Sequence, residues 1–345
     1  METKAHFSLV TATMLLALLL SACGASTPVP TVVPATEAPT QEQIIPTATT
    51  EPPALTETPE PAPEPEFLFE ISPADSPLQD PYGVAVNQEG TIYVNDAGNS
   101  RVLVFDSDGG LLAAWDAQGS GDGEFTSLGF GGMAVDSQGN VFVVDNGNFR
   151  IQKFDSEGNF LTAWGSEGTD EGQFVRAIGI SVDTEGNVYV TDDENPFIQK
   201  FDNDGNFLMR FGDAGRGDGE FQHATGIVVD EDGNIFVSDY QARRVQKFDS
   251  TGQFIARWNM EKVGSGLSGT PEGLAVDAQG QIYVTDYLNG AVQVFSNDGE
   301  FLWTWGSGGD EEGQLARPTS IALDEAGRIY IVNQADNSVT VFQLP

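Results

Sequence analysis

The sequence of 345 residues contains very little cysteine and histidine. Cys23 is its single cysteine, which excludes an internal disulfide and a zinc cluster built from cysteines. Its two histidines, His6 and His223, cannot supply the three protein ligands of a histidine-rich catalytic zinc site. A folded domain in this chain therefore needs a hydrophobic core large enough to be stable without disulfides.

Basic residues are also scarce. The formal net charge is -37, because 52 acidic residues face only 15 lysines and arginines. Without a basic stripe to neutralise phosphates, nucleic acid is not expected as a partner, and anionic lipid surfaces would repel the protein. Solubility outside the cell explains the acidity most simply, and attraction of a specific cationic partner is the second interpretation.

Long apolar runs are missing too. The run from Leu9 to Leu20 is short and is followed by small residues, so it predicts an export signal and not a membrane span. The next residues, "LSAC", resemble the lipobox of bacterial lipoproteins, which implies that residues 1–23 are a signal peptide and that Cys23 is lipidated. An ordinary secretory peptide, with Cys23 incidental, is the alternative. We expect a cell-envelope lipoprotein that faces outside the cytoplasm and contacts the membrane through its lipid only.

Residues 24–65 lack aromatic residues, lysine and arginine, and are rich in proline, threonine and glutamate. Such a segment cannot bury enough apolar surface to offset the entropy lost on ordering, and its prolines favour an extended chain. We predict a disordered stalk over this range and a folded domain over residues 66–345.

From residue 81 onward the sequence repeats itself six times. Segments such as "GMAVDSQGNVFVVD" and "GIVVDEDGNIFVSD" recur. The residues at one aligned position are Asn87, Asp136, Asp183, Asp230, Asp277 and Asp324. The first two are 49 residues apart, and each later pair of neighbours is 47 residues apart. A regular period of this length is typical of repeat arrays and propellers. Each copy contains four short alternating segments separated by turns with glycine, which predicts four antiparallel strands and therefore one propeller blade.

The "AVD" first strand, the "GNVYVTD" second strand, the "RIQKFD" third strand and the "GEF" or "GQF" before the next copy resemble the NHL repeat. The resemblance covers residues 66–345 and implies an all-β, six-bladed β-propeller, a fold that carries binding modules, scaffolds and several enzymes.

The isolated stretch "EFLFEI" at residues 66–71 resembles the fourth strand of a repeat, while the last repeat stops after its third strand. We predict that this N-terminal strand completes the last blade and closes the ring, with Ile71 in the place that tryptophan holds in most other blades.

Two sets of residues recur once per blade. Phenylalanines at the end of the third strand and tryptophans in the fourth predict packing between blades. Aspartates end the second strand in five blades: Asp96, Asp145, Asp192, Asp239 and Asp286. In three of these blades an arginine follows five residues later. These carboxylates most simply pair with the arginines or cap their own loops. A ring of carboxylates that binds a cation is the alternative, and its selectivity would then lie in blades three, five and six.

An enzyme is the less favoured class. Lyases that resemble this family depend on histidine, and His223 alone cannot supply the histidines that their sites need. The gluconolactonase-like propellers hold a divalent ion through Glu, Asn and Asp at the channel mouth, and Glu272 stands just before a first strand, where such a ligand would point inward. The other residues at this repeat position do not complete a carboxylate cage. A hydrolase that uses a divalent cation such as calcium stays open as the alternative.

The leading prediction is a monomeric binding or scaffold module that recognises a protein, peptide or glycan and needs no cofactor. The loops that join the second strand to the third, and one blade to the next, should lie on one face around the channel and vary most between repeats. The candidate contacts, chosen because exposed tyrosine and arginine are favoured interface anchors, are Tyr82, Phe130, Arg176, His223, Tyr240, Glu272, Tyr287 and Arg317.

Overall fold

The computed structural model describes residues 64–263, 266–309, 311 and 313–345. The predicted signal peptide, the lipidation at Cys23 and all but the last two residues of the predicted stalk lie outside the described residues. Among the residues that are described, no helix is long and apolar enough to cross a membrane.

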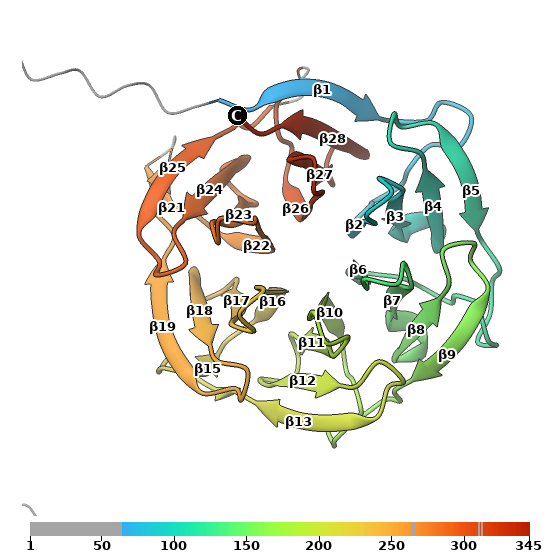
Figure 1. Cartoon of the computed structure of the whole chain (residues 1–345), viewed down its shortest axis with the longest axis horizontal. Coiled ribbons are helices and arrows are strands. Elements are labelled where there is room, and N and C mark those ends of the chain that lie inside the picture. Colours follow the sequence, from blue (N-terminus) through green and yellow to red (C-terminus); the bar gives the residue numbers. More distant parts are fainter. Residues whose placement is uncertain (1–63, 264–265, 310, 312) are drawn as a thin grey trace, which may run out of the picture. The chain divides into compact units, whose positions relative to one another are not determined.

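Six four-stranded antiparallel sheets surround a central channel, which confirms the all-β six-bladed propeller (Figure 1). The innermost strand of each blade lines the channel. These strands are β2 (Val84–Val86), β6 (Met133–Val135), β10 (Ala177–Val182), β16 (Ala224–Val229), β22 (Pro271–Val276) and β26 (Pro318–Leu323). The second strands are β3 (Ile92–Asp96), β7 (Val141–Asp145), β11 (Val188–Asp192), β17 (Ile235–Asp239), β23 (Ile282–Asp286) and β27 (Arg328–Asn333).

The third strands are β4 (Arg101–Phe105), β8 (Arg150–Phe154), β12 (Ile198–Phe201), β18 (Arg244–Phe248), β24 (Ala291–Phe295) and β28 (Ser338–Gln343). The outer strands are β5 (Leu111–Trp115), β9 (Phe160–Trp164), β13 (Phe207–Phe211), β19 (Phe254–Asn259), β25 (Phe301–Trp305) and the N-terminal β1 (Glu66–Ile71). Two short pairs lie in the links between blades, β14 (Asp213–Ala214) with β15 (Glu220–Phe221) and β20 (Lys262–Val263) with β21 (Leu267–Ser268). Short 3-10 turns, η1 (Ala97–Asn99) and η2 (Asn146–Asn148), follow the second strands of the first two blades.

The ring closes where the sequence predicts. Strand β1 pairs antiparallel with β28, so that Ile71 faces Val339 and the N-terminal strand supplies the fourth strand of the last blade. Ile71 is 2% exposed and packs in one apolar cluster with Phe105 of the first blade. This places Ile71 where the other blades use an aromatic side chain.

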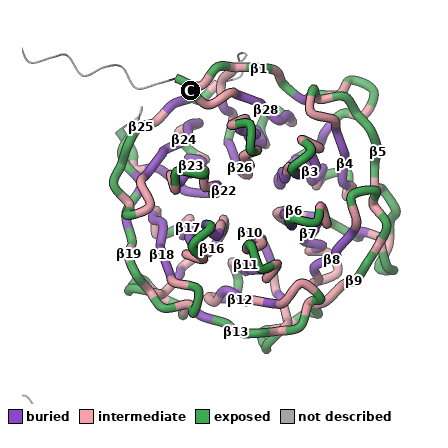
Figure 2. Tube along the Cα trace, in the orientation of Figure 1, coloured by how far each residue is buried: buried purple, intermediate pink, exposed green. Residues whose placement is uncertain are grey.

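The recurring aromatic residues pack one blade against the next, as predicted. The Trp115 ring of the first blade lies 5.2 Å from the Phe154 ring of the second, and Trp258 lies 5.9 Å from Phe295 in the same relation between later blades. The third strands are almost fully buried, whereas most residues of the outer strands are exposed or partly exposed (Figure 2). Burial of these large rings between blades stabilises the ring.

We name the two faces of the ring by their connections. The loop face carries the links between blades and the connections from second to third strands; the hairpin face carries the tight turns that join first to second and third to fourth strands. In the first turn of four blades an aspartate accepts backbone N–H groups from the residues two and four positions later, as Asp183 does from Glu185 and Asn187. In the first blade Asn87 takes this place. Each inner strand therefore starts at the loop face, and the first residues of these strands surround the channel mouth.

Candidate functional site

Three layers of residues line the channel below the loop face, each with one residue from every blade. The first layer is Tyr82, Gly131, Ile178, Thr225, Glu272 and Thr319; the second is Gly83, Gly132, Gly179, Gly226, Gly273 and Ser320; the third is Val84, Met133, Ile180, Ile227, Leu274 and Ile321. Most of these residues line a cavity of about 70 Å³ at the axis. The third layer gives this cavity an apolar floor.

Glycine fills most of the second layer because neighbouring inner strands approach closely. A Cβ at Gly226 would collide with the carbonyl oxygen of Glu272, and a Cβ at Gly273 would collide with that of Thr319. Hydroxyl groups of the second strands fix the same carbonyls: the Ser238 Oγ donates to the Glu272 carbonyl oxygen at 2.6 Å. The backbone that carries Glu272 is thus held on both sides.

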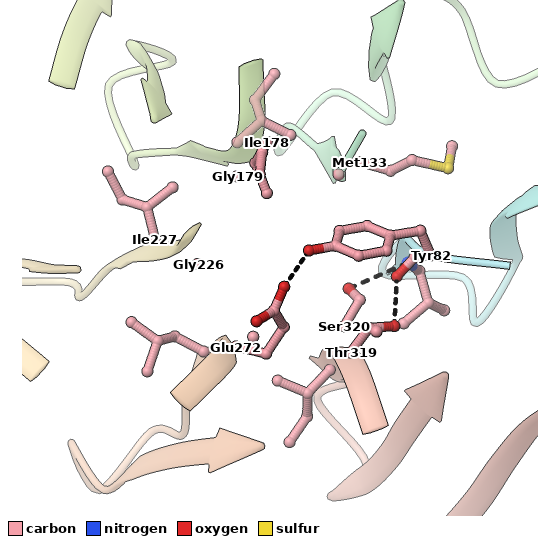
Figure 3. A pocket seen from close by; sticks show the side chains of 15 residues that line it. Tyr82, Met133, Ile178, Gly179, Gly226, Ile227, Glu272, Thr319 and Ser320 are labelled. Atoms are coloured by element: carbon pink, nitrogen blue, oxygen red, sulfur yellow. Dashed lines mark hydrogen bonds between the residues drawn. The ribbon is translucent and has the colours of Figure 1, made fainter. Parts of the chain in front are cut away.

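Glu272 and Tyr82 meet inside the channel (Figure 3). The phenol of Tyr82 donates a hydrogen bond to Oε1 of Glu272, whereas the buried Oε2 has no hydrogen-bond partner in the structure. Glu272 is 8% exposed and Tyr82 is 7% exposed. The prediction that Tyr82 is an exposed interface anchor is therefore wrong, because its ring enters the channel to reach the carboxylate. Glu272 lies within β22 and not just before it, and it points inward as expected.

Burial changes the acid–base behaviour of this pair. Desolvation raises the pKa of Glu272 from 4.5 to about 7, the hydrogen bond from Tyr82 opposes this shift, and the negative charge of Asp193 adds to it. Desolvation and the neighbouring carboxylate also raise the pKa of Tyr82, so the phenol stays a neutral donor. Glu272 is thus poised to exchange a proton near neutral pH.

The other six predicted contacts lie on the loop face, and the structure brings five of them into an arc over blades three to six. Arg176 forms an ion pair with Asp193 at 2.5 Å, and Nδ1 of His223 lies 3.7 Å from the same carboxylate. The Tyr240 and Tyr287 rings lie 6.2 Å apart. The exposed Arg317 guanidinium lies 6.0 Å from the centre of the Tyr287 ring. Phe130 is 48% exposed on the opposite side of the mouth, with its ring 5.4 Å from that of Tyr82.

A shallow hollow of about 350 Å³ opens on the loop face between blades five and six. Tyr287, Arg317 and the exposed Leu288 line it. Sequence reasoning missed Leu288, Ser238 and Asp193. Asp193 could have been found, because it occupies the same position after the second strand as Tyr240 and Tyr287 in their repeats.

The aspartates that end the second strands serve the fold. Asp96, Asp145 and Asp239 are fully buried and pair with Arg101, Arg150 and Arg244, respectively. In the third and fifth blades, which lack the arginine, Asp192 and Asp286 accept backbone N–H groups such as those of Val175 and Thr270. This supports the simpler interpretation, in which these carboxylates hold the loops.

A divalent ion does not fit the channel mouth well. Among the residues that the structure describes, Glu272 is the single carboxylate that lines the cavity. Within the part of the chain that the structure describes, no three His, Cys, Asp or Glu side chains are grouped so that they could hold a metal ion. Calcium takes about six to eight oxygen ligands, usually including several carboxylates. We therefore derive no chemistry from a metal at this site.

Solved structures with the same fold include enzymes with very different sequences. A streptogramin B lyase is 15% identical, with a TM-score of 0.59 and coverage of 81% of this chain and 98% of that chain. A gluconolactonase from Xanthomonas campestris is 19% identical, with a TM-score of 0.58 and coverage of 82% and 95%. A protein of unknown function from Bacteroides thetaiotaomicron is 15% identical, with a TM-score of 0.61 and coverage of 81% and 73%. At such identities these likenesses concern the fold alone.

No curated protein matches the sequence. The family model DUF5128, described as a 6-bladed beta-propeller, matches residues 73–164 and 167–265, which together make up more than half of the chain, and an NHL repeat matches residues 269–295. The chain therefore belongs to the DUF5128 family of six-bladed β-propellers and carries an NHL repeat.

Proposed function

We propose that this protein is a binding module, anchored in a membrane through a lipid on Cys23 and facing outside the cytoplasm, that recognises a protein, peptide or glycan through its loop face. The observation that carries the proposal is the hollow of about 350 Å³ beside the channel mouth, where Tyr287, Leu288 and Arg317 leave aromatic, apolar and cationic groups open to a partner. Hollows of this size that combine apolar walls with a few polar groups are typical ligand sites.

The composition of the loop face supports the same proposal. Arg317 is an exposed cation on this face, although the protein as a whole is strongly acidic. Exposed arginine and tyrosine are enriched at interaction hot spots, because each offers a large contact area together with hydrogen bonds. Phe130 extends this surface to the other side of the mouth.

The hairpin face offers a larger hollow of about 710 Å³, but two of the carboxylates that line it are already engaged in hydrogen bonds. Asp277 accepts hydrogen bonds from Gln279, Gln281 and Tyr283, and Asp324 is held in the same way. The chain also enters the propeller on this side, since Glu66 lies beside Gln343, whose amide contacts the turn at Ala326. A stalk that joins here would leave the loop face directed away from the membrane.

The alternative function is a divalent-metal-dependent hydrolase of the gluconolactonase-like type. The likeness to a gluconolactonase concerns the fold, and the channel mouth presents one carboxylate where such an ion would need several oxygen ligands. Binding is therefore the function that the geometry supports better.

Photo-crosslinking with the full-length protein in membranes of its host tests the proposal. A photoreactive amino acid is placed at Phe130 or Leu288 on the loop face, and at the exposed Gln138 or Gln279 on the hairpin face as matched controls. We expect discrete adducts from the loop-face positions that disappear when Arg317 is changed to Ser. Adducts from the hairpin-face positions only, or loop-face adducts that persist in Arg317→Ser, would contradict it.

A further inference from the structure

The strongest unexplained feature of the molecule is the buried oxygen Oε2 of Glu272. Glu272 lines the axial cavity, and its buried Oε2 has no hydrogen-bond partner in the structure. Buried carboxylate oxygens in native proteins are almost always satisfied, because an isolated one loses its hydration without compensation. An unpartnered buried oxygen on a residue that lines a cavity therefore suggests that a ligand completes its hydrogen bonding.

The carboxylate cannot easily turn away to find water. Ser238 and Thr225 both donate to the backbone carbonyl of Glu272, and Gly226 packs against that carbonyl from the neighbouring strand. Tyr82, which comes from the first blade, donates to Oε1 inside the channel (Figure 3). These contacts hold the backbone of Glu272 and one oxygen of its carboxylate, so that the side chain stays in the channel.

The cavity selects the chemistry of the ligand. One carboxylate balances one positive charge, whereas a divalent ion would be left with too few anionic ligands. An aromatic ring beside the carboxylate favours an organic cation, and the floor formed by Val84, Ile227, Leu274 and their neighbours accepts methylene groups. A volume of about 70 Å³ admits the end of a chain and not a sugar ring.

We propose that the axial cavity receives a primary ammonium group, presented by a lysine side chain or by the amino terminus of a peptide that lies on the loop face. The inference rests on the proposed function, since the loop face would hold the rest of the peptide. The ammonium donates to Oε2 of Glu272, and its methylene groups contact the apolar floor. The acidic surface of the protein attracts such a cationic peptide from a distance.

Binding should depend on pH. Ionised Glu272 is the form that attracts an ammonium, and burial raises the pKa of this carboxyl to about 7, so affinity rises as the pH passes through neutrality. A lysine side chain stays charged to about pH 10, whereas an amino terminus loses its charge near pH 8, so the two sources differ above pH 8. The other titratable or charged groups around the site are Tyr82, Asp193, His223, Tyr240, Arg243, Tyr287 and Arg317.

Calorimetry with the full-length protein tests the inference. The probes are Nα-acetyl-lysine methylamide, which has only the side-chain ammonium, alanine methylamide, which has only the terminal one, and Nα-acetyl-norleucine methylamide, which has neither. At pH 8 we expect one ammonium probe to bind at least about tenfold more tightly to the wild type than to Glu272→Gln, as for a hydrogen bond to a charged group. Glu325→Gln on the hairpin face, which removes one exposed carboxylate, should bind like the wild type.

Three results would overturn the inference: equal binding of the norleucine probe, unchanged affinity in Glu272→Gln, or calcium binding that requires Glu272 and excludes the ammonium probes. Unfolding curves establish that Glu272→Gln is folded. Failure of the proposed function is distinguishable, because loop-face crosslinks would then be absent even if the ammonium probe binds. If loop-face crosslinks persist in Glu272→Gln and no ammonium probe binds, this inference is wrong and the proposed function is not contradicted.

Discussion

The phenol of Tyr82 in the first blade donates a hydrogen bond across the channel to Glu272 in the fifth blade, 190 residues later in the sequence. The bond leaves the second carboxylate oxygen buried and unpartnered. A group in this environment links the stability of the whole ring to pH, because Glu272 exchanges its proton at different pH values in the folded and unfolded chain.

The first prediction concerns this linkage. Because the folded pKa of Glu272 is about 7 and the unfolded value is 4.5, the folded state holds its proton more tightly, and stability falls as the pH rises from about 4.5 to about 7. The loss should reach about 3 kcal/mol and stay constant at higher pH. Urea unfolding of the wild type and Glu272→Gln between pH 4.5 and 8 measures it, with Glu325→Gln as the control. A stability difference between wild type and Glu272→Gln that does not change with pH would contradict the prediction.

Ring closure gives a second prediction. Ile71 is 2% exposed, whereas Leu68 in the same strand is 36% exposed. Ile71→Ala should lower the free energy of unfolding by about 2–5 kcal/mol, because it leaves a cavity between the first and last blades. Leu68→Ala should cost much less. Deletion of residues 66–71 should expose the edge of β28 and cause aggregation, visible by light scattering. Unchanged melting of the deletion variant would show that β1 does not close the ring.

The glycines of the second channel layer give a third prediction. Gly226→Ala places a Cβ against the Glu272 carbonyl and should destabilise the protein by about 1–3 kcal/mol, because two inner strands must move apart. Gly308→Ala is the matched control, since the nearest atom to its Cβ would be 3.5 Å away. Denaturant unfolding compares the two variants. Equal stability of both would indicate that the inner strands are not packed as tightly as the structure shows.

The buried ion pairs give a fourth prediction. Nε of Arg150 lies 2.8 Å from Oδ2 of Asp145, a carboxylate that is fully buried and whose pKa burial raises. Arg150→Ala should cost about 3–5 kcal/mol, because it leaves an uncompensated charge in the blade. Arg257 and Asp218 form an exposed pair at 3.1 Å, and Arg257→Ala should cost less than about 1 kcal/mol. Similar losses of stability in Arg150→Ala and Arg257→Ala, measured by thermal unfolding, would contradict this prediction. They would mean that Asp145 forms other hydrogen bonds or becomes protonated when Arg150 is removed.

Much of the fold follows from the sequence because each blade is a local unit. The repeat of 47 residues, the alternation within each segment and the glycine turns predict the strands, and the missing fourth strand of the last repeat predicts the role of residues 66–71. The structure confirms these predictions since the same contacts recur between neighbours, as in the pairs Trp115 with Phe154 and Trp258 with Phe295.

The sequence by itself determined the number of blades, the order of their strands, the closing strand and the residues that surround the channel mouth, because these depend on periodicity and on the two-residue alternation of strands. Only the tertiary structure decided that Tyr82 turns inward, that it satisfies one oxygen of Glu272 and that it leaves the other unpartnered. Closure of the ring brings residues of the first and fifth blades across one narrow channel, and burial there shifts a proton equilibrium that no local pattern reveals.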